Sequence, residues 1–369
     1  MKLTIAALAA TLAIPAFAAS VDQAALTKYA KRALPRCPDS IVTLTPLTSG
    51  PFPTNFVAFE VSLTGKDQSC STKKMLLYSP SSGQVIIGNA LPLPNDPRPL
   101  QVRLSEYSTQ LLKRDINATV MPFPLPDGLK FASLAKQTEY GPFSYHGYID
   151  ASERFLIIGV RGNIKEDPGK TLLDAVGISD AVRRGNPKAK VEIVELSDFE
   201  CPGCGAAHKT IWPIIEKNLS KINFARLDLP LFEHHQWSLA AALGARAIQR
   251  VAPDKYWTYV DYVFGNQEAI GKQPFDTVLK NFVDDHDMNW KAIEAIYKSP
   301  AEQQAVIQQV ERAFDNNLNS TPTFVLNGQV LAFGPEGTFA IDAIKSALGL
   351  PITPAPKKPA VKKTAAKKK

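Results

Sequence analysis

Apolar and polar positions divide the first part of the chain into short strands and two helices. The runs typical of strands are residues 55–63, 74–78, 84–87 and 143–160. Apolar residues recur at helical spacing in two other segments, residues 21–34 and 100–112. Turn residues such as Gly65 and Ser81-Ser82-Gly83 separate the strands. We therefore expect an α+β N-terminal domain over residues 19–165.

This first part contains a weak internal similarity. Residues 78–88 and residues 148–159 each show a strand, a turn and a second strand that ends at a glycine, Gly88 or Gly159. Duplication and two unrelated hairpins explain this pattern equally well, so both explanations stay open.

The second part of the chain begins after a linker. Residues 166–186 have the composition of a linker with one short helix at 171–176, and a second domain is expected over residues 187–349. Its first strand-like run, residues 191–196, leads into Cys201-Pro202-Gly203-Cys204, which opens a helix. The unpaired amides and the dipole at a helix N-terminus favour thiolate over thiol. Two cysteines one turn apart can close a disulfide, so the motif predicts a two-electron redox switch.

The N-terminus has the composition of a secretory signal. It contains Lys2, an apolar stretch over residues 3–14 and a small-residue end, Ala16-Phe17-Ala18. The apolar stretch is short for a membrane span, and no later segment has eighteen uninterrupted apolar residues. We expect residues 1–18 to be a signal peptide and the mature chain to be periplasmic. A buried N-terminal helix is the alternative.

Composition sets bounds on size and partners. The chain has 369 residues, of which 45% are hydrophobic and 21% charged, as in a globular protein of two ordinary domains. The formal net charge is +7, and the seven lysines at the C-terminal end account for all of it. The folded body therefore offers no basic character to nucleic acid. Residues 350–369 mix Lys, Pro and Ala, cannot bury a core, and are expected to be disordered.

Four cysteines form an even set in a chain expected to be exported, where disulfides persist. Because Cys201 and Cys204 are neighbours, Cys37 and Cys70 are left to pair with each other. A disulfide that closes this loop would stabilise the N-terminal region by roughly 3–4 kcal/mol, and we expect it to be structural. A second redox pair that feeds electrons to the first is the alternative.

Four segments together resemble DsbA-like thiol–disulfide oxidoreductases. The active-site signature of that family is similar to residues 195–204, and its loop and hairpin are similar to residues 320–328. Residues 228–234 and the helical stretch that includes residues 253–260 resemble the entry to its helical insertion and the insertion itself. The resemblance implies an α/β thioredoxin-like fold with an inserted helical subdomain at about residues 236–315. A smaller α+β N-terminal domain would precede it.

The resemblance also implies roles for individual residues. Cys201 would be the nucleophile, Cys204 the resolving cysteine, and Glu195 a buried carboxylate that helps to move the proton of Cys204. A carboxylate among apolar neighbours should be desolvated, which suits proton transfer near neutrality. Pro322 would follow a cis bond and face the cysteines. The expected substrate-binding residues are Thr321, which presents backbone groups to an extended chain, together with Pro202 and Gly203.

The function that follows is that of a periplasmic thiol:disulfide oxidoreductase acting on exported proteins with cysteines. It would use no cofactor beyond the Cys201–Cys204 disulfide, and a membrane or periplasmic redox partner would recycle that disulfide. Pro202 and Gly203 supply no imidazole to stabilise a thiolate, so we expect Cys201 to be less acidic than in the strongest oxidants.

Two alternatives stay open. The strand–turn–strand pattern that ends at Gly88 vaguely resembles the dimerisation domain of DsbC-like proteins, which would favour a DsbC/DsbG-like isomerase or reductase working as a homodimer. The other alternative is a metal-binding protein that uses Cys201 and Cys204 with His208, or with His234 and His235. No metal is expected, because a second spaced Cys/His pair is missing.

Overall fold

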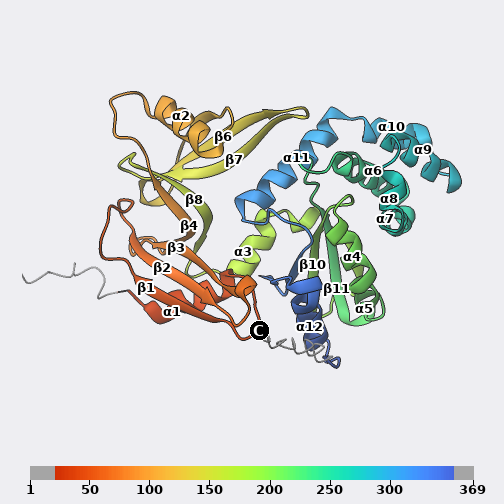
Figure 1. Cartoon of the computed structure of the whole chain (residues 1–369), viewed down its shortest axis with the longest axis horizontal. Helices are drawn as coiled ribbons and strands as arrows, with labels where there is room; N and C mark the ends of the chain where they lie inside the picture. Colours follow the sequence, from red (N-terminus) through yellow and green to blue (C-terminus); the bar gives the residue numbers. More distant parts are fainter. Residues whose placement is uncertain (1–20, 353–369) are drawn as a thin grey trace, which may run out of the picture.

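The computed structural model describes residues 21–352. The expected signal peptide at 1–18 lies outside the described residues, as does the expected disordered tail from residue 353 onward. The described part consists of a sheet-rich N-terminal domain and a C-terminal domain whose sheet is flanked by helices (Figure 1). None of the helices within residues 21–352 combines the length and apolarity needed to cross a membrane.

The N-terminal domain consists of two successive halves, each with one helix followed by four strands. The first half contains α1 (Gln23–Ala33), β1 (Ile41–Pro46), β2 (Val57–Thr64), β3 (Thr72–Tyr78) and β4 (Gln84–Pro92). The second half contains α2 (Leu100–Leu112), β5 (Asn117–Pro124), β6 (Lys130–Thr138), β7 (Gly141–Ile149) and β8 (Phe155–Asn163). The α+β class expected here is confirmed, although strands β1, β5 and β6 were not expected.

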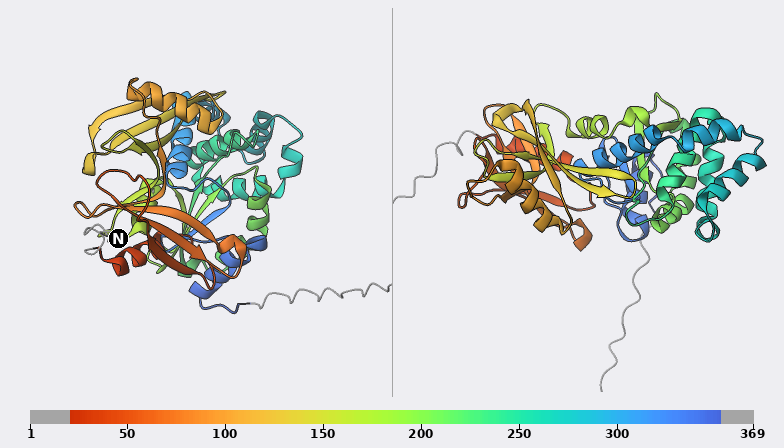
Figure 2. Two further views of the ribbon diagram at one scale, coloured as in Figure 1. Left: turned by 60° about the vertical axis from the view of Figure 1, so that its left-hand side comes forward. Right: turned by 90° about the horizontal axis from the view of Figure 1, so that it is seen from above.

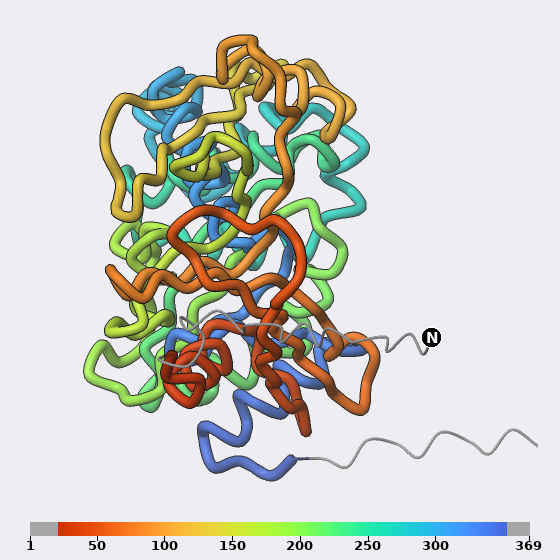
Figure 3. Tube along the Cα trace, turned by 90° about the vertical axis from the view of Figure 1, so that its left-hand side faces the viewer, coloured from red at the N-terminus to blue at the C-terminus, as the bar shows by residue number. Residues whose placement is uncertain are grey.

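The two halves share one antiparallel eight-stranded sheet with the strand order β1-β2-β3-β4-β8-β7-β6-β5. This order is symmetric about the central pair β4 and β8, in which Gly88 lies opposite Gly159. In Figure 3 the first half, red to orange, lies below the second half, orange to yellow. The similar segments 78–88 and 148–159 fall on the equivalent hairpins β3–β4 and β7–β8. The structure therefore favours duplication over two unrelated hairpins.

Glycine is required where the two central strands, β4 and β8, come closest to each other. A Cβ atom added at Gly88 would lie 2.0 Å from the carbonyl oxygen of Ile158, and one at Gly159 would lie 2.6 Å from that of Ile87. Alternation along β4 then assigns the two faces of the sheet. Val85 and Ile87 belong to the core under α1, while Ile86 packs on the opposite face.

The helix α2 covers the second half as α1 covers the first. Leu104 of α2 packs with Leu134 and Leu156. The first half is further tied by the disulfide between Cys37 and Cys70, whose Cα atoms are 5.7 Å apart. The expected pairing of these two cysteines is therefore confirmed.

The C-terminal domain has a five-stranded sheet with the order β13-β12-β10-β11-β9. Its strands are β9 (Val182–Gly185), β10 (Val191–Ser197), β11 (Ile222–Asp228), β12 (Thr323–Leu326) and β13 (Gln329–Val330). Strands β10 and β11 are parallel, and the other neighbours are antiparallel. Strand β9 lies inside the range expected as a linker, residues 166–186. Because it forms the edge of this sheet, the sheet begins before the expected boundary at residue 187.

Helices cover the sheet and form an insertion between β11 and β12. Those outside the insertion are α3 (Pro168–Ala175), α4 (Pro202–Thr210), α5 (Trp212–Glu216) and α12 (Thr338–Ala347). The insertion contains α6 (Ser238–Val251), α7 (Tyr256–Gly265), α8 (Gln267–Ile270), α9 (Phe275–Asp285), α10 (Trp290–Tyr297) and α11 (Pro300–Asp315). This agrees with the helical insertion expected at about residues 236–315.

The two domains touch at two places. Near the N-terminus, the amide of Arg36 donates to the carbonyl of Val330, and the amide of Ala332 donates to the carbonyl of Arg36. At the other end, the hairpin β6–β7 reaches from the N-terminal sheet to α11, as seen from above in Figure 2. The contact points fix the N-terminal domain beside the inserted helices.

Candidate active site

Two cysteines meet where β10 passes into α4. Cys201 is the N-cap residue, and Pro202 occupies the first helical position, where its missing N–H is not needed. The Cys201 side chain is at the edge of the core with 9% of its surface exposed, while Cys204 is fully buried one turn further on. Both thiols are free in this structure. The site therefore presents one reachable sulfur and one enclosed sulfur.

The pKa values of the two thiols are shifted in opposite directions. The pKa of Cys201 is lowered to about 5, chiefly by a hydrogen bond from the Cys204 thiol, although burial opposes the shift. Thr321 and the backbone amides of Gly203 and Cys204, at the N-terminus of α4, lower it further. Burial raises the pKa of Cys204 well above its usual value, and the nearby Cys201 charge adds to this. At neutral pH, Cys201 is therefore a thiolate and Cys204 a neutral thiol, as a nucleophile and its resolving partner require.

A loop before β12 faces the cysteines. The Cys201 Sγ lies 3.5 Å from the carbonyl oxygen of Thr321, and the peptide bond from Thr321 to Pro322 is cis, as expected. A Cβ atom added at Gly203 would lie 3.4 Å from Cδ of Pro322 and 3.6 Å from the Cys201 Sγ. The structure thus brings together the five expected residues of the motif and loop: Cys201, Pro202, Gly203, Thr321 and Pro322.

Glu195 and an unpredicted arginine form a buried charged block below α4. The parallel register places Glu195 opposite Arg226 and Ser197 opposite Asp228, and alternation puts all four side chains on one face. The Arg226 guanidinium is 1% exposed and contacts both carboxylates, at 3.4 Å from Glu195 and 3.0 Å from Asp228. The predicted desolvation of Glu195 is therefore accompanied by a counter-charge.

Within this block, the Asp228 carboxyl keeps its proton to a higher pH than an ordinary aspartate does. Burial raises its pKa to about 6, against the opposing effect of Arg226. A cavity of about 190 Å³ lies against Arg226, Asp228 and Tyr256. The sequence signal for this block is a pair of charged residues, Arg226 and Asp228, at alternate positions of a strand whose other residues, Asn223 apart, are apolar.

His235, which the sequence analysis named only for the alternative metal site, is a further active-site residue. Its Nδ1 lies 2.7 Å from Oδ2 of Asp198, a buried carboxylate three residues before Cys201. Burial disfavours the protonated imidazole, but the bond to Asp198 and the negative charge of Cys201 outweigh burial and raise the pKa of His235. A protonated His235 in turn stabilises the Cys201 thiolate.

The inserted helices also hold the backbone at the cysteines. The Gln267 side-chain amide donates to the carbonyls of Phe199 and Cys201, at 2.8 and 3.0 Å. This amide belongs to α8, so the insertion itself fixes the entry to α4.

Of the three histidines proposed for a metal site, His235 lies near the cysteines, where it bonds Asp198, and the other two do not. His208 lies 3.0 Å from Asp261 and stacks on Trp212, while His234 is exposed. Within residues 21–352, no group of three potential metal-binding side chains is present.

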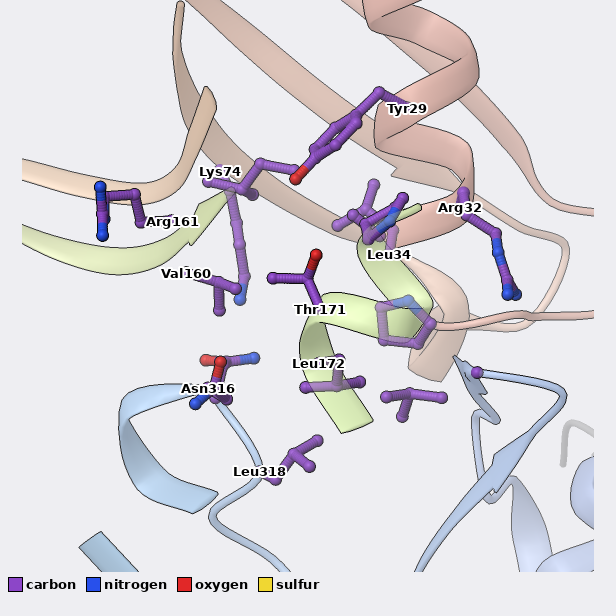
Figure 4. A pocket seen from close by; sticks show the side chains of 17 residues that line it. Tyr29, Arg32, Leu34, Lys74, Val160, Arg161, Thr171, Leu172, Asn316 and Leu318 are labelled. Atoms are coloured by element: carbon purple, nitrogen blue, oxygen red, sulfur yellow. The ribbon is translucent and has the colours of Figure 1, made fainter. Parts of the chain in front are cut away.

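A separate cavity lies between the domains. It measures about 80 Å³ and is lined by residues of α1, α3 and the two sheets, including Tyr29, Lys74 and Thr171, and by Asn316 at the end of α11 (Figure 4). None of the residues around the cysteines lines it, so the redox chemistry is located elsewhere.

Comparison with known proteins identifies the C-terminal domain. A sequence model of the thioredoxin family matches residues 179–346. The matched region contains the cysteine motif and the whole helical insertion. The match begins before residue 187, in agreement with β9 as part of the sheet. The thioredoxin-like fold with a helical insertion and a preceding α+β domain is therefore confirmed.

The curated proteins that the chain matches have two kinds of name. The chain is 26% identical over 165 residues to Na(+)/H(+) antiporter NhaA 3 of Salinispora tropica. This match covers 45% of the chain and 24% of the antiporter. It is 24% identical over 155 residues to Disulfide bond formation protein D of Bacillus subtilis, covering 40% of the chain and 68% of that protein. The chain thus spans about a quarter of the length of the antiporter it matches.

Solved structures similar to this chain also match a little under half of it. Oxidised BdbD of Bacillus subtilis is 22% identical, with a TM-score of 0.37, over 47% of this chain and 93% of that one. Protein-disulfide isomerase of Novosphingobium aromaticivorans is 17% identical, with a TM-score of 0.39, over 46% of this chain and 97% of that one.

Proposed function

We propose that the protein is a thiol–disulfide oxidoreductase that exchanges disulfides with cysteines of exported proteins in the periplasm. The observation that carries the proposal is the contrast between two neighbouring sulfurs, a reachable thiolate at Cys201 and an enclosed thiol at Cys204. The name Disulfide bond formation protein D of a relative supports the same reaction class.

In the oxidising direction, a client thiolate attacks Sγ of Cys201 in the Cys201–Cys204 disulfide. The bond between the two cysteines breaks, and Cys204 leaves as a thiolate that takes up a proton, because its buried position favours the neutral form. A second client thiolate then attacks the client sulfur of the mixed disulfide and releases the Cys201 thiolate. Two electrons pass from two client thiols to the cysteine pair, and a membrane or periplasmic redox partner removes them.

The low pKa of Cys201 favours this direction, because a more acidic thiol leaves faster. The value of about 5 lies between the values of about 3.5 and about 7 typical of DsbA and thioredoxin. The cis loop places backbone groups of Thr321 beside the sulfur, where an extended client segment can pair with them.

An isomerase or reductase is the second candidate. It is favoured by the two paired halves of the N-terminal domain, which take the place of the two dimerisation domains that a DsbC-like homodimer would bring together. The inner strand of each half is already matched by the other, β4 with β8. In such an isomerase, a single chain would supply both halves of the N-terminal sheet and one catalytic domain.

The equilibrium between the Cys201–Cys204 couple and glutathione tests the proposal and separates the two candidates. A potential near about −120 mV would support an oxidase and one near about −270 mV a reductant. Refolding of scrambled ribonuclease and reduction of insulin should both be lost in Cys201→Ser, while Cys204→Ser should accumulate mixed disulfides. A couple that stays inert at every glutathione ratio, or stoichiometric zinc or copper on the purified chain, would contradict the proposal.

A further inference from the structure

The hairpin β6–β7 of the N-terminal domain is fastened along its free edge to the thioredoxin domain. The amides of Ser144 and His146 donate to carboxylates of Glu311 and Asp315, at 2.6 and 3.0 Å. The two acids are four residues apart on α11 and therefore lie on one side of that helix. They satisfy strand amides that β8 does not pair, since β7 and β8 pair only at their ends.

Aromatic side chains continue this contact toward the active site. Phe143 is 2% exposed and belongs to the core of the thioredoxin domain, with its ring 5.8 Å from that of Phe232. At the tip of the hairpin, the Tyr140 ring lies 5.5 Å from the same phenylalanine. Phe232 is therefore held between two rings of the other domain.

Lys136 is the buried charge at this contact. Its side chain is 4% exposed, its ammonium group contacts the Glu233 carboxylate, and it lies 2.9 Å from the Tyr145 hydroxyl. The ammonium also lies about 5 Å from the ring centroids of Phe143 and Tyr145, at 5.1 and 4.9 Å. A buried charge of this kind is stabilised by its partner, so the position of Glu233 is coupled to that of Lys136.

The loop that contains Glu233 is in turn bonded to the active-site segment. The Leu231 amide donates to Asp198 at 2.7 Å, and the Trp237 amide donates to Glu200 at 2.6 Å. His235 bonds the same Asp198 and feels the charges of Cys201 and Glu200. A continuous series of contacts thus runs from the N-terminal domain to Asp198 and Glu200, in the segment that leads directly into Cys201.

We propose that Lys136 is a positioning residue of the active site, because it holds Glu233 and with it the loop that places His235 against Asp198, three residues before Cys201. The N-terminal domain is then a structural part of the catalytic centre. This inference rests on the proposed function only for its biological meaning, because the placement of His235 can be measured without a client.

The experiment compares the full-length variant Lys136→Met with the matched control Lys73→Met. Lys73 also lies on a strand of the N-terminal sheet and pairs with one glutamate, Glu60, but it is exposed and lies in the other half. The measured quantity is the pKa of Cys201, from thiolate absorbance of the reduced protein. We expect Lys136→Met to raise this pKa by about 0.5 pH unit or more and Lys73→Met to leave it unchanged.

A double-mutant cycle separates positioning from a general loss of structure. If Lys136 acts through His235, then Lys136→Met should cause no further shift in a His235→Gln background. Should Lys136→Met fail to fold, Glu233→Gln provides the second variant, because Glu233 lies on an exposed loop and should give the same direction of shift.

A folded Lys136→Met and a folded Glu233→Gln with the Cys201 pKa of the unmodified protein would overturn the inference. So would an undiminished shift in the His235→Gln background. Absence of client turnover in the unmodified protein would refute the proposed function, yet it would leave the titration result standing, so the two failures can be told apart.

Discussion

Arg226 lies directly opposite Glu195 on the parallel strands β10 and β11, and its guanidinium joins Glu195 to Asp228. One cation thus serves two carboxylates beneath the resolving cysteine. All three groups are removed from bulk water, so each depends on the others for its charge balance.

Replacement of Arg226 by methionine should be strongly destabilising. It would leave two buried carboxylates without a cation, and breaking a buried ion pair in this way costs about 3–5 kcal/mol. Urea unfolding measures the loss, and Arg183→Met is the control, because Arg183 pairs with Glu192 near the surface. Equal effects of the two substitutions would contradict the assignment of a buried network.

Asp228 should make stability fall as pH rises through the mildly acidic range. An unfolded aspartate loses its proton near pH 4, while the folded carboxyl keeps its proton up to about pH 6. Folding therefore becomes less favourable between these pH values, by about 3 kcal/mol for the full shift. Asp228→Asn cannot titrate, so its free energy of unfolding relative to the unmodified protein should increase from pH 4 to pH 7. A pH-independent difference would contradict this prediction.

His235→Gln should raise the pKa of Cys201 from its value of about 5, because a positive partner of the thiolate is lost. We expect an increase of about 0.5–1 pH unit. At pH 5, alkylation of the reduced protein by iodoacetamide should consequently slow. His234→Gln is the adjacent control, since His234 is exposed, and it should leave the alkylation profile unchanged.

Removal of the Cys37–Cys70 disulfide should weaken the N-terminal domain. Replacing both cysteines with alanine removes a constraint on the unfolded chain worth roughly 3–4 kcal/mol. Denaturant unfolding of this double variant tests the value. A comparable loss on replacing Cys201 and Cys204 would show that the effect is not specific to the structural pair.

Gly88→Ala should disturb the centre of the N-terminal sheet. The new methyl group would meet the Ile158 carbonyl and the Gly159 Cα, so the strands must separate, at a cost of about 1–3 kcal/mol. Gly265→Ala is the control, because a Cβ atom there meets nothing within 4 Å. Thermal unfolding of the two variants makes the comparison.

Sequence reasoning located the parts of the site whose chemistry is local. The cysteine motif and the segment around Pro322 are each contiguous, and each has a spacing that constrains its own backbone. His235, Arg226 and Lys136 could not be assigned in this way, because their roles depend on contacts between distant elements. Lys136 and Glu233 are separated by almost a hundred positions and by a domain boundary.

The strands were predicted unevenly for a similar reason. Inner strands such as β2 and β4 bury most of their apolar residues, which are visible in the sequence. Edge strands bury little: β1 alternates between exposed and half-buried residues, and β9 has only four residues. At these edges a weak hydrophobic signal accompanies weak burial, and β9 was taken for a linker. The inner strand β6 was missed for another reason, because the residues it buries include the short Ala132, the polar Ser133 and the charged Lys136.

The close pairing of Gly88 with Gly159 also determines how the sheet responds to dilution. Two separate chains joined at such a seam would come apart as their concentration fell, since their association is bimolecular. Here the partner strand belongs to the same polypeptide, joined to the first through α2 and strands β5 to β7, which fixes its local concentration. The eight-stranded platform should consequently persist at any protein level, including the few molecules of a single vesicle.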